Sequence, residues 1–261
     1  MPTTLNLNLS KGVVEKKIAN AGLPGLRAKV ILVFDISASM RSLYARGVVQ
    51  NVFDRLVPIA MAMDDDGSAD VYAFQDNCTR IRDVLTPNNF QDYVSRHITN
   101  LPMGGTRYSP AIQMVMDDFL GDKENVELTE APTSGLRAWA SRLVGMGEKF
   151  SYAHTPAYVM YFTDGDCNRE DKPVTERLLV QASKHGLFWQ FIGIEGTGGD
   201  FHFLENLDTM EGRARDNANL LKVHYDELTS KTDEQLYGDL LVEFPGWVRL
   251  AMSANIIKKQ P

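Results

Sequence analysis

Side chains that carry oxygen atoms cluster directly after two apolar runs of this sequence. The run KVILVF (residues 29–34) is followed by the motif DISAS, and the run AYVMYF (residues 157–162) is followed by TDGD. A third polar motif, GGT, occupies residues 104–106. The oxygen-bearing side chains that these motifs supply are Asp35, Ser37, Ser39, Thr106 and Asp164.

This donor set is typical of a site for a hard divalent cation. Mg²⁺ prefers oxygen ligands in an octahedral array and usually keeps some of its water. Three of the five donors are neutral hydroxyls, so the protein would neutralise the ion only in part. We therefore predict a site for Mg²⁺, with Mn²⁺ or Ca²⁺ as alternatives, whose open position accepts a carboxylate from another protein.

The elements that must position these side chains alternate between strands and helices. Short continuous apolar runs are typical of strands that are buried on both faces. Their alternation with helical segments predicts an α/β fold, in which a doubly wound, mostly parallel sheet has helices on both faces. Residues 70–85 are typical of a hairpin around the polar turn QDN, which predicts one antiparallel edge strand. Ligands bind at the carboxyl ends of strands in such sheets, and the motifs DISAS and TDGD fall there.

Two further segments accompany this pattern. Residues 1–26 are predicted to be a lead-in, with a short strand from the alternating leucines between residues 5 and 9, and residues 27–261 form the main domain. Residues 121–155 are polar and long for a connection. They predict an insertion near the partner-binding face that contributes no strand and has one helix at about 136–150.

The three polar motifs, in this order, resemble the metal-ion-dependent adhesion site (MIDAS) of von Willebrand factor A (vWA) domains. That site combines D-x-S-x-S after the first strand, a threonine in a Gly-Gly-Thr loop, and T-D-G after a later strand. The runs LRAKVILVFDISASM, MDDDGSADVYAF and GGTRYSP resemble the vWA domains of bacterial tellurium-resistance operons. The opening LNLNLSKG is similar to a calcium-binding family of the same operons.

The resemblance implies a binding module and not an enzyme. The five oxygen donors would hold the cation, and a protein partner would offer an acidic side chain to it. One such partner would be another product of a tellurium-resistance operon. The setting that the resemblance implies is a tellurite-resistance or stress-response system.

Composition argues against several other classes of protein. The formal net charge of −7 disfavours nucleic acid and anionic membranes as partners. The sequence shows no apolar stretch of membrane-spanning length and no secretory signal pattern, so the cytoplasm is the expected location. Cys78 and Cys167 fit no zinc or redox spacing, and the five histidines show no paired metal spacing.

The alternative function is a metal-dependent phosphohydrolase of the haloacid-dehalogenase kind, which also places an aspartate after its first strand. Such an enzyme needs a second aspartate two residues later as general acid, and Ser37 occupies that position. An EF-hand loop beginning at Asp164 fails because Arg169 stands where glycine is required. The motif GTGG at residues 196–199 lacks the ending of a phosphate loop, so an ordinary loop is favoured.

Residues beside the candidate ligands have two interpretations each. Asp166 either joins the outer shell of the cation or caps the following helix, and capping is favoured because aspartate is common before helices. Arg107 and Tyr108 either form the rim of the binding face, where both residue types are favoured, or pack against the core.

Overall fold

The protein is built around one large sheet. The structure, a computed structural model, describes residues 7–64, 66–130 and 149–260. The strands of the large sheet are β1 (Lys29–Asp35), β2 (Asp70–Phe74), β3 (Cys78–Arg80), β6 (Ala157–Thr163), β7 (Leu187–Glu195) and β8 (Ala218–His224). Their order is β3-β2-β1-β6-β7-β8, and every neighbouring pair is parallel except the antiparallel pair β2–β3. The predicted sheet, with its antiparallel edge strand, is confirmed.

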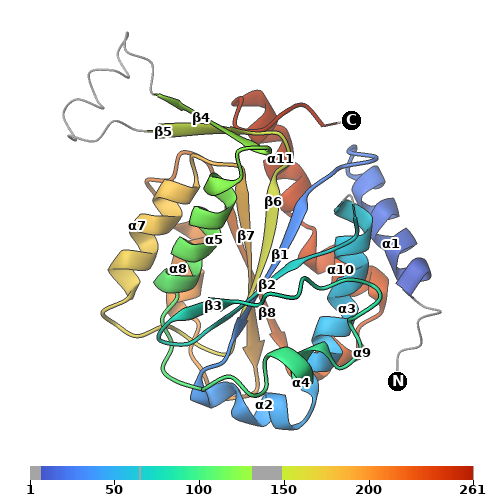
Figure 1. Ribbon diagram of the computed structural model, residues 1–261, viewed down its shortest axis with the longest axis vertical. Helices are drawn as coiled ribbons and strands as arrows, with labels where there is room; N and C mark the ends of the chain where they lie inside the picture. The colour runs from blue at the N-terminus through green and yellow to red at the C-terminus, as the bar shows by residue number, and fades with distance from the viewer. Residues whose placement is uncertain (1–6, 65, 131–148, 261) are drawn as a thin grey trace.

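Helices cover both faces of this sheet. They are α1 (Leu7–Asn20), η2 (Ala38–Met40), α2 (Arg41–Ala45), α3 (Val48–Met63), α4 (Tyr93–His97), α5 (Ser109–Gly121), α7 (Lys172–Ala182), α8 (His202–Thr209), α9 (Tyr225–Ser230), α10 (Asp233–Leu240) and α11 (Phe244–Ser253). Figure 1 shows α5, α7 and α8 on one side and α1, α3 and α10 on the other, so the sheet is doubly wound.

The apolar runs identified in the sequence form the centre of the core. β1 and β6 lie side by side, and Phe34 stacks on Phe162 with ring centroids 4.7 Å apart. Every residue of β6 is buried, as is typical of a strand covered on both faces. Because β1 and β6 are parallel neighbours, Asp35 and Asp164 are brought to the same edge of the sheet.

The N-terminal segment differs from its prediction. Residues 7–20 form the helix α1, and no strand is present in the described part of residues 1–26. Leu7, Val14 and Ile18 lie on one buried face of α1, and their spacing is helical. The alternation of leucines between residues 5 and 9 does not reveal this longer pattern. α1 packs against α3 and α10, so the lead-in contributes to the core.

The insertion also differs from its prediction. Its described ends form a two-stranded antiparallel hairpin of β4 (Val126–Glu130) and β5 (Lys149–Ala153), although no strand was expected. The predicted helix at about 136–150 lies largely outside the described residues. The hairpin leads directly into the start of β6, at the edge of the sheet opposite to Asp35 and Asp164 (Figure 1). The described part of the insertion is therefore not near the candidate site.

The segment after β1 is divided at a glycine. Gly47 has a φ of +71°, in the left-handed region that favours glycine, and it separates α2 from α3.

The predicted second strand of the hairpin is shorter than expected, because β3 ends at Arg80. No helix among the described residues is both long enough and apolar enough to cross a membrane.

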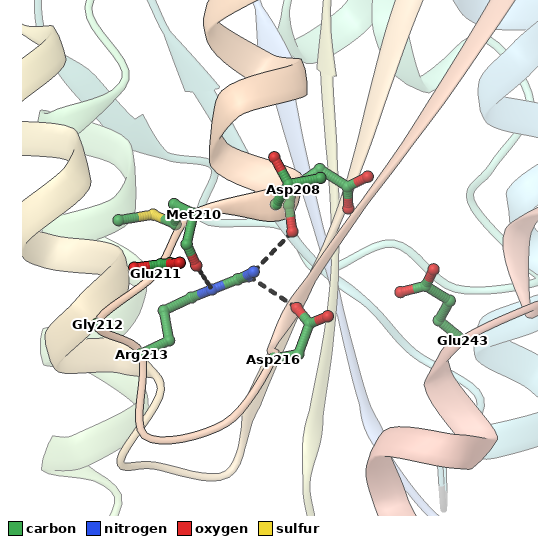
Figure 2. Close-up of a pocket in the computed structure, with 8 residues that line it drawn as sticks. Asp208, Met210, Glu211, Gly212, Arg213, Asp216 and Glu243 are labelled. Carbon is green, nitrogen blue, oxygen red and sulfur yellow. Dashed lines mark hydrogen bonds and ion pairs between the residues drawn. The ribbon is translucent and has the colours of Figure 1, made fainter.

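A polar cavity lies between α8, the start of β8 and the start of α11. It has a volume of about 390 Å³ and is lined by acidic side chains around Arg213 (Figure 2). The Arg213 side chain is only 5% exposed, and it pairs with Asp216 at 2.9 Å and donates to the Asp208 carbonyl at 2.6 Å. Burial raises the pKa of Asp208 and of Glu243, and Arg213 opposes both increases.

Candidate metal centre

Asp35 is the last residue of β1 and is completely buried. One carboxylate oxygen accepts the Ser37 backbone N–H at 2.6 Å, and the other accepts the Thr163 hydroxyl at 2.7 Å. The Tyr44 hydroxyl donates to the Asp35 carbonyl at 2.9 Å. These contacts fix the direction in which the chain leaves the sheet, so the DISAS loop has one orientation.

A chain of hydrogen bonds joins the two serines to the second carboxylate. The hydroxyls of Ser37 and Ser39 are 3.0 Å apart, and the Ser39 hydroxyl donates to Asp164 Oδ1 at 2.8 Å. Asp164 directly follows β6, and its side chain is nearly buried. The structure therefore brings together the side chains that the sequence places 125 residues apart.

The Gly-Gly-Thr loop joins this group through its main chain. Gly104 pairs with Ser37 as an isolated parallel bridge. A Cβ on either glycine would displace a side chain of the β2–β3 turn, because it would lie 2.5 Å from Gln75 Oε1 at position 104 and 2.5 Å from Asp76 Oδ1 at position 105. The pair of glycines thus allows the loop to approach the sheet edge closely.

Thr106 itself is placed between two of the site's loops. Its carbonyl accepts the Asn168 N–H at 2.8 Å, in the segment that follows TDGD. The next residue, Arg107, donates its backbone N–H to the Gln75 carbonyl at 3.0 Å. All five predicted donors therefore belong to loops in direct contact, and Thr106 is the one attached through its backbone.

The electrostatics of the site favour a cation. Burial raises the pKa of Asp35 to about 7, against the hydrogen bonds from Ser37 and Thr163. Burial also raises the pKa of Asp164, against the Ser39 and Thr197 hydroxyls. Among the described residues, Asp164 Oδ2 has no hydrogen-bond partner although it is buried. A buried carboxylate without a counter-charge is unfavourable, and a bound cation would supply both the charge and the missing contact.

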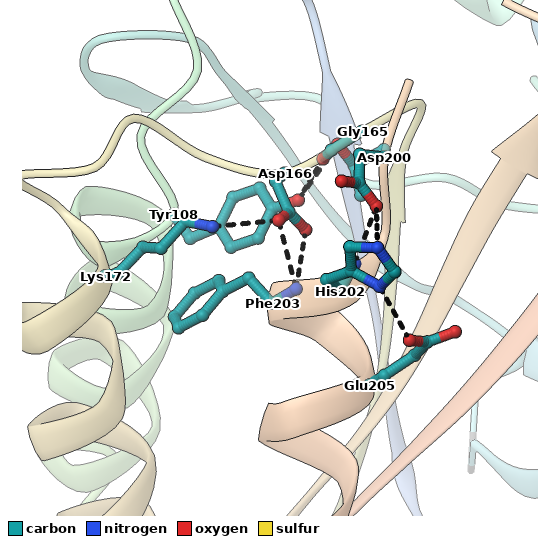
Figure 3. Close-up of polar contacts among 9 residues, drawn as sticks. Tyr108, Gly165, Asp166, Lys172, Asp200, His202, Phe203 and Glu205 are labelled. Atoms are coloured by element: carbon teal, nitrogen blue, oxygen red, sulfur yellow. Dashed lines mark hydrogen bonds and ion pairs between the residues drawn. The ribbon is translucent and has the colours of Figure 1, made fainter. Parts of the chain in front are cut away.

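Neighbouring polar residues hold the surrounding helices. Both oxygens of Asp166 accept the Phe203 N–H, at 3.0 and 3.1 Å, and one pairs with Lys172 at 2.8 Å (Figure 3). Asp166 thus caps a helix as favoured, but the helix is α8 and not the next helix in sequence, α7. The residue before α7, Asp171, accepts the backbone N–H groups of Tyr108 and Ser109 at the start of α5.

The two residues after Thr106 have different roles. Tyr108 is completely buried and donates its hydroxyl to the Gly165 carbonyl, so it packs under the site. Arg107 is about half exposed, with its Nε 3.4 Å from Asp171 Oδ1, so it lies at the rim.

Two site residues were missed by sequence reasoning. Thr163, the first residue of the T-D-G motif, donates to Asp35 Oδ2, and the motif itself was the available signal. Thr197 lies in the GTGG loop and donates to the Asp164 carbonyl at 3.3 Å. No pattern in the sequence linked this loop to the site.

The donor set fits a hard cation better than a softer one. It combines two carboxylates with hydroxyls, which are ligands for Mg²⁺, Mn²⁺ or Ca²⁺. No group of three or more His, Cys, Asp or Glu side chains with metal-binding geometry occurs within residues 7–64, 66–130 and 149–260. A closed zinc site of thiolates and imidazoles is therefore not what the described part of the chain offers.

The fold and these loops define the class of protein as a vWA domain. A family model described as the vWA found in the TerF C terminus matches residues 27–129 and 142–257. The chain belongs to this vWA-TerF-like family. It is also 35% identical over 257 residues to the uncharacterized protein YcbR of Bacillus subtilis (strain 168), covering 97% of this chain and 91% of that protein.

Several solved structures share the fold of this chain. Proximal thread matrix protein 1 of the mussel byssus matches with a TM-score of 0.53 at 17% identity, over 81% of this chain and 47% of that chain. A structure of the same protein with a zinc-occupied MIDAS motif gives a TM-score of 0.51 at 17% identity, over 82% and 48%. The chain thus spans about half the length of the byssus protein. The TFIIH p34 N-terminal domain gives a TM-score of 0.51 at 10% identity, over 80% and 99%.

Proposed function

We propose that the protein is a divalent-cation-dependent protein-binding module. The cation, Mg²⁺ in the first instance, is held by Asp35, Ser37, Ser39, Thr106 and Asp164. An acidic side chain of a protein partner completes its coordination. The protein has no catalytic role in this proposal.

The observation that carries the proposal is the pair of buried carboxylates. The negative charges of Asp35 and Asp164 repel each other, and burial raises the pKa of each carboxyl. No ion pair joins either of them to Lys, Arg or His in the described part of the chain. Two carboxylates facing hydroxyl donors at the carboxyl edge of a parallel sheet are an arrangement that a divalent cation stabilises.

An open coordination position follows from the same donor set. Two carboxylates and three hydroxyls leave the ion electrophilic, and a hard cation readily accepts a further carboxylate oxygen. Ser39 and Arg107 are exposed at this edge, so a partner side chain has access to it. The zinc-occupied MIDAS of the byssus protein, which shares the fold, supports the choice of a cation.

The biological setting of the proposal rests on the family. The matching model describes a domain of TerF, which supports a partner within a tellurium-resistance or stress-response system. The relative YcbR is uncharacterized, so it adds no partner of its own.

A calorimetric titration with Mg²⁺ and Mn²⁺, followed by a partner pull-down from the native host with and without a chelator, tests the proposal. Asp164→Ala should lower cation affinity by at least about a hundredfold and abolish partner binding, because it removes a charge beside the ion. Thr106→Ala should weaken partner binding more than cation binding. Thr79→Ala, on an exposed residue of β3, is the matched control.

Two results would contradict the proposal. Either a complex that survives the chelator, or wild-type partner binding by both Thr106→Ala and Asp164→Ala, would place recognition on another surface. A phosphatase assay with Mg²⁺ addresses the alternative of a haloacid-dehalogenase type of enzyme. That alternative has no support from Ser37, whose hydroxyl contacts Ser39 where a general acid would be needed.

A further inference from the structure

The loop that follows β7, Gly196–Asp200, lies directly on the T-D-G segment. A Cβ on Gly199 would be 1.8 Å from the Asp164 carbonyl oxygen and 2.9 Å from the Gly165 Cα. Thr197 donates its hydroxyl to the same carbonyl at 3.3 Å. The two loops are therefore in backbone contact at the residue that supplies a candidate ligand.

The sequence of this loop suits such close contact. Gly196 and Gly198 have φ values of +102° and +88°, which side chains rarely permit. A Cβ on Gly196 would also lie 2.6 Å from His224 Nε2, at the end of β8. The glycines of GTGG thus serve a turn packed between two strand ends, and the motif has no phosphate-binding role in this explanation.

Both loops are also attached to the start of α8. Asp200 accepts the His202 N–H at 3.1 Å, and Asp166 accepts the Phe203 N–H (Figure 3). One end of the loop is consequently tied to α8 through Asp200, and the other end continues from β7. A loop fixed in this way can hold a neighbouring side chain in one rotamer, which is how supporting residues tune a metal site.

Within the loop, Thr197 is the residue with a polar side chain next to Asp164. Its hydroxyl donates to the Asp164 carbonyl, so it holds the backbone from which the Asp164 carboxylate projects. Ser39 binds Oδ1, while Oδ2 is buried without a hydrogen-bond partner among the described residues. Thr197 is therefore placed to restrict the backbone of Asp164, while Ser39 of the DISAS loop binds its carboxylate.

We propose that Thr197 is a positioning residue of the cation site, and that the loop Gly196–Asp200 sets cation affinity by fixing the backbone of Asp164. This inference rests on the proposed function. Thr197 acts through Asp164, so the loss of its hydroxyl should reduce cation affinity without unfolding the protein.

The test is a calorimetric Mg²⁺ and Mn²⁺ titration of the full chain and two variants of this residue. Thr197→Val, which keeps the shape and removes the hydroxyl, should lower affinity about fivefold, the effect of losing one hydrogen bond to a backbone carbonyl. Thr197→Ser should restore affinity to within about twofold, because it returns the hydroxyl. The melting temperature without metal should stay unchanged in both variants.

Thr209→Val is the matched control, because its hydroxyl also donates to a backbone carbonyl, that of Glu205 at 3.2 Å, but at the far end of α8. It should titrate like the wild type. If the wild type binds the cation and Thr197→Val binds it equally well, or if Thr197→Ser is as weak as Thr197→Val, the positioning role is wrong while the proposed function stands. If the wild type binds neither cation, both proposals are wrong.

Discussion

Replacing Asp35 by asparagine should make the metal-free protein more stable at alkaline pH while abolishing its response to the cation. The carboxyl is completely buried, and burial raises its pKa from the ordinary 3.8 to about 7. In the folded state it therefore holds its proton more tightly than in the unfolded chain. Its ionisation weakens the fold as pH rises from about 4 to about 7, and the loss is constant above that range.

The size of the effect follows from the same values. A pKa that rises from 3.8 to about 7 corresponds to about 4 kcal/mol, because each unit is worth about 1.4 kcal/mol. Asparagine does not ionise, so it avoids this loss of stability, and it can keep the hydrogen bonds that Asp35 makes. Its carbonyl can accept the Ser37 N–H, and its amide can donate to the Thr163 hydroxyl, which then donates to the Gly165 carbonyl 3.0 Å away.

Urea denaturation in a chelator at pH 5 and pH 8 measures the difference. Asp35→Asn should be more stable than the wild type by about 2 kcal/mol at pH 5 and by about 4 kcal/mol at pH 8. Mg²⁺ at a hundredfold its Kd should stabilise the wild type by about 2.7 kcal/mol and the variant not at all. A variant that is less stable than the wild type at pH 8, or shows the same difference at both pH values, would refute the reasoning.

Two further predictions concern regions away from the site. Arg213→Met should destabilise the protein by about 2 kcal/mol at pH 7, because the Asp216 carboxylate and the Asp208 carbonyl lose their guanidinium partner. The loss should shrink as pH falls toward 4, since Arg213 opposes the raised pKa values of Asp208 and Glu243 and these carboxyls then take up protons. A loss of stability that does not depend on pH, measured by urea denaturation, would contradict this. Replacing residues 131–148 by Asn-Gly should leave the fold intact, because the strand ends on either side of this segment are paired in register in the β4–β5 hairpin. Failure to fold, monitored by circular dichroism, would show that the segment packs into the core.

The central sheet could be predicted because its strands carry a local signal. KVILVF and AYVMYF are continuous apolar runs, and the polar residues that follow them fall at strand ends in any parallel arrangement. Asp35 and Asp164 therefore lie close together as predicted, although the apolar runs alone do not show that β1 and β6 are neighbours. The order of the three motifs, through the resemblance to vWA domains, indicated that the two strand ends lie together.

The errors arose where a short pattern depends on distant partners. Leucines alternating between residues 5 and 9 suggest a strand, but α3 and α10 offer an apolar surface that selects a helix using Val14 and Ile18. In β4, Val126 and Leu128 alternate with polar residues, which was a usable strand signal. The hairpin itself could not be predicted, because 18 residues separate β4 from its partner β5 and pairing over that separation has no local signature.

Thr197 shows why the last part of a site is hardest to predict. Its role depends on the distance between two loops, and that distance is set by Gly199, which has no side chain to collide with the Asp164 carbonyl. Burial raises the pKa of both carboxyls, and hydroxyl donors oppose the increase at each of them. For Asp35 the balance leaves a pKa of about 7. Because a proton on Asp35 and a cation compete for the same oxygens, cation affinity should rise with pH up to about 7 and then level off, which metal titrations at pH 6, 7 and 8 can measure. An affinity that does not change across this range would mean that Asp35 is already ionised and that its burial is compensated by another group.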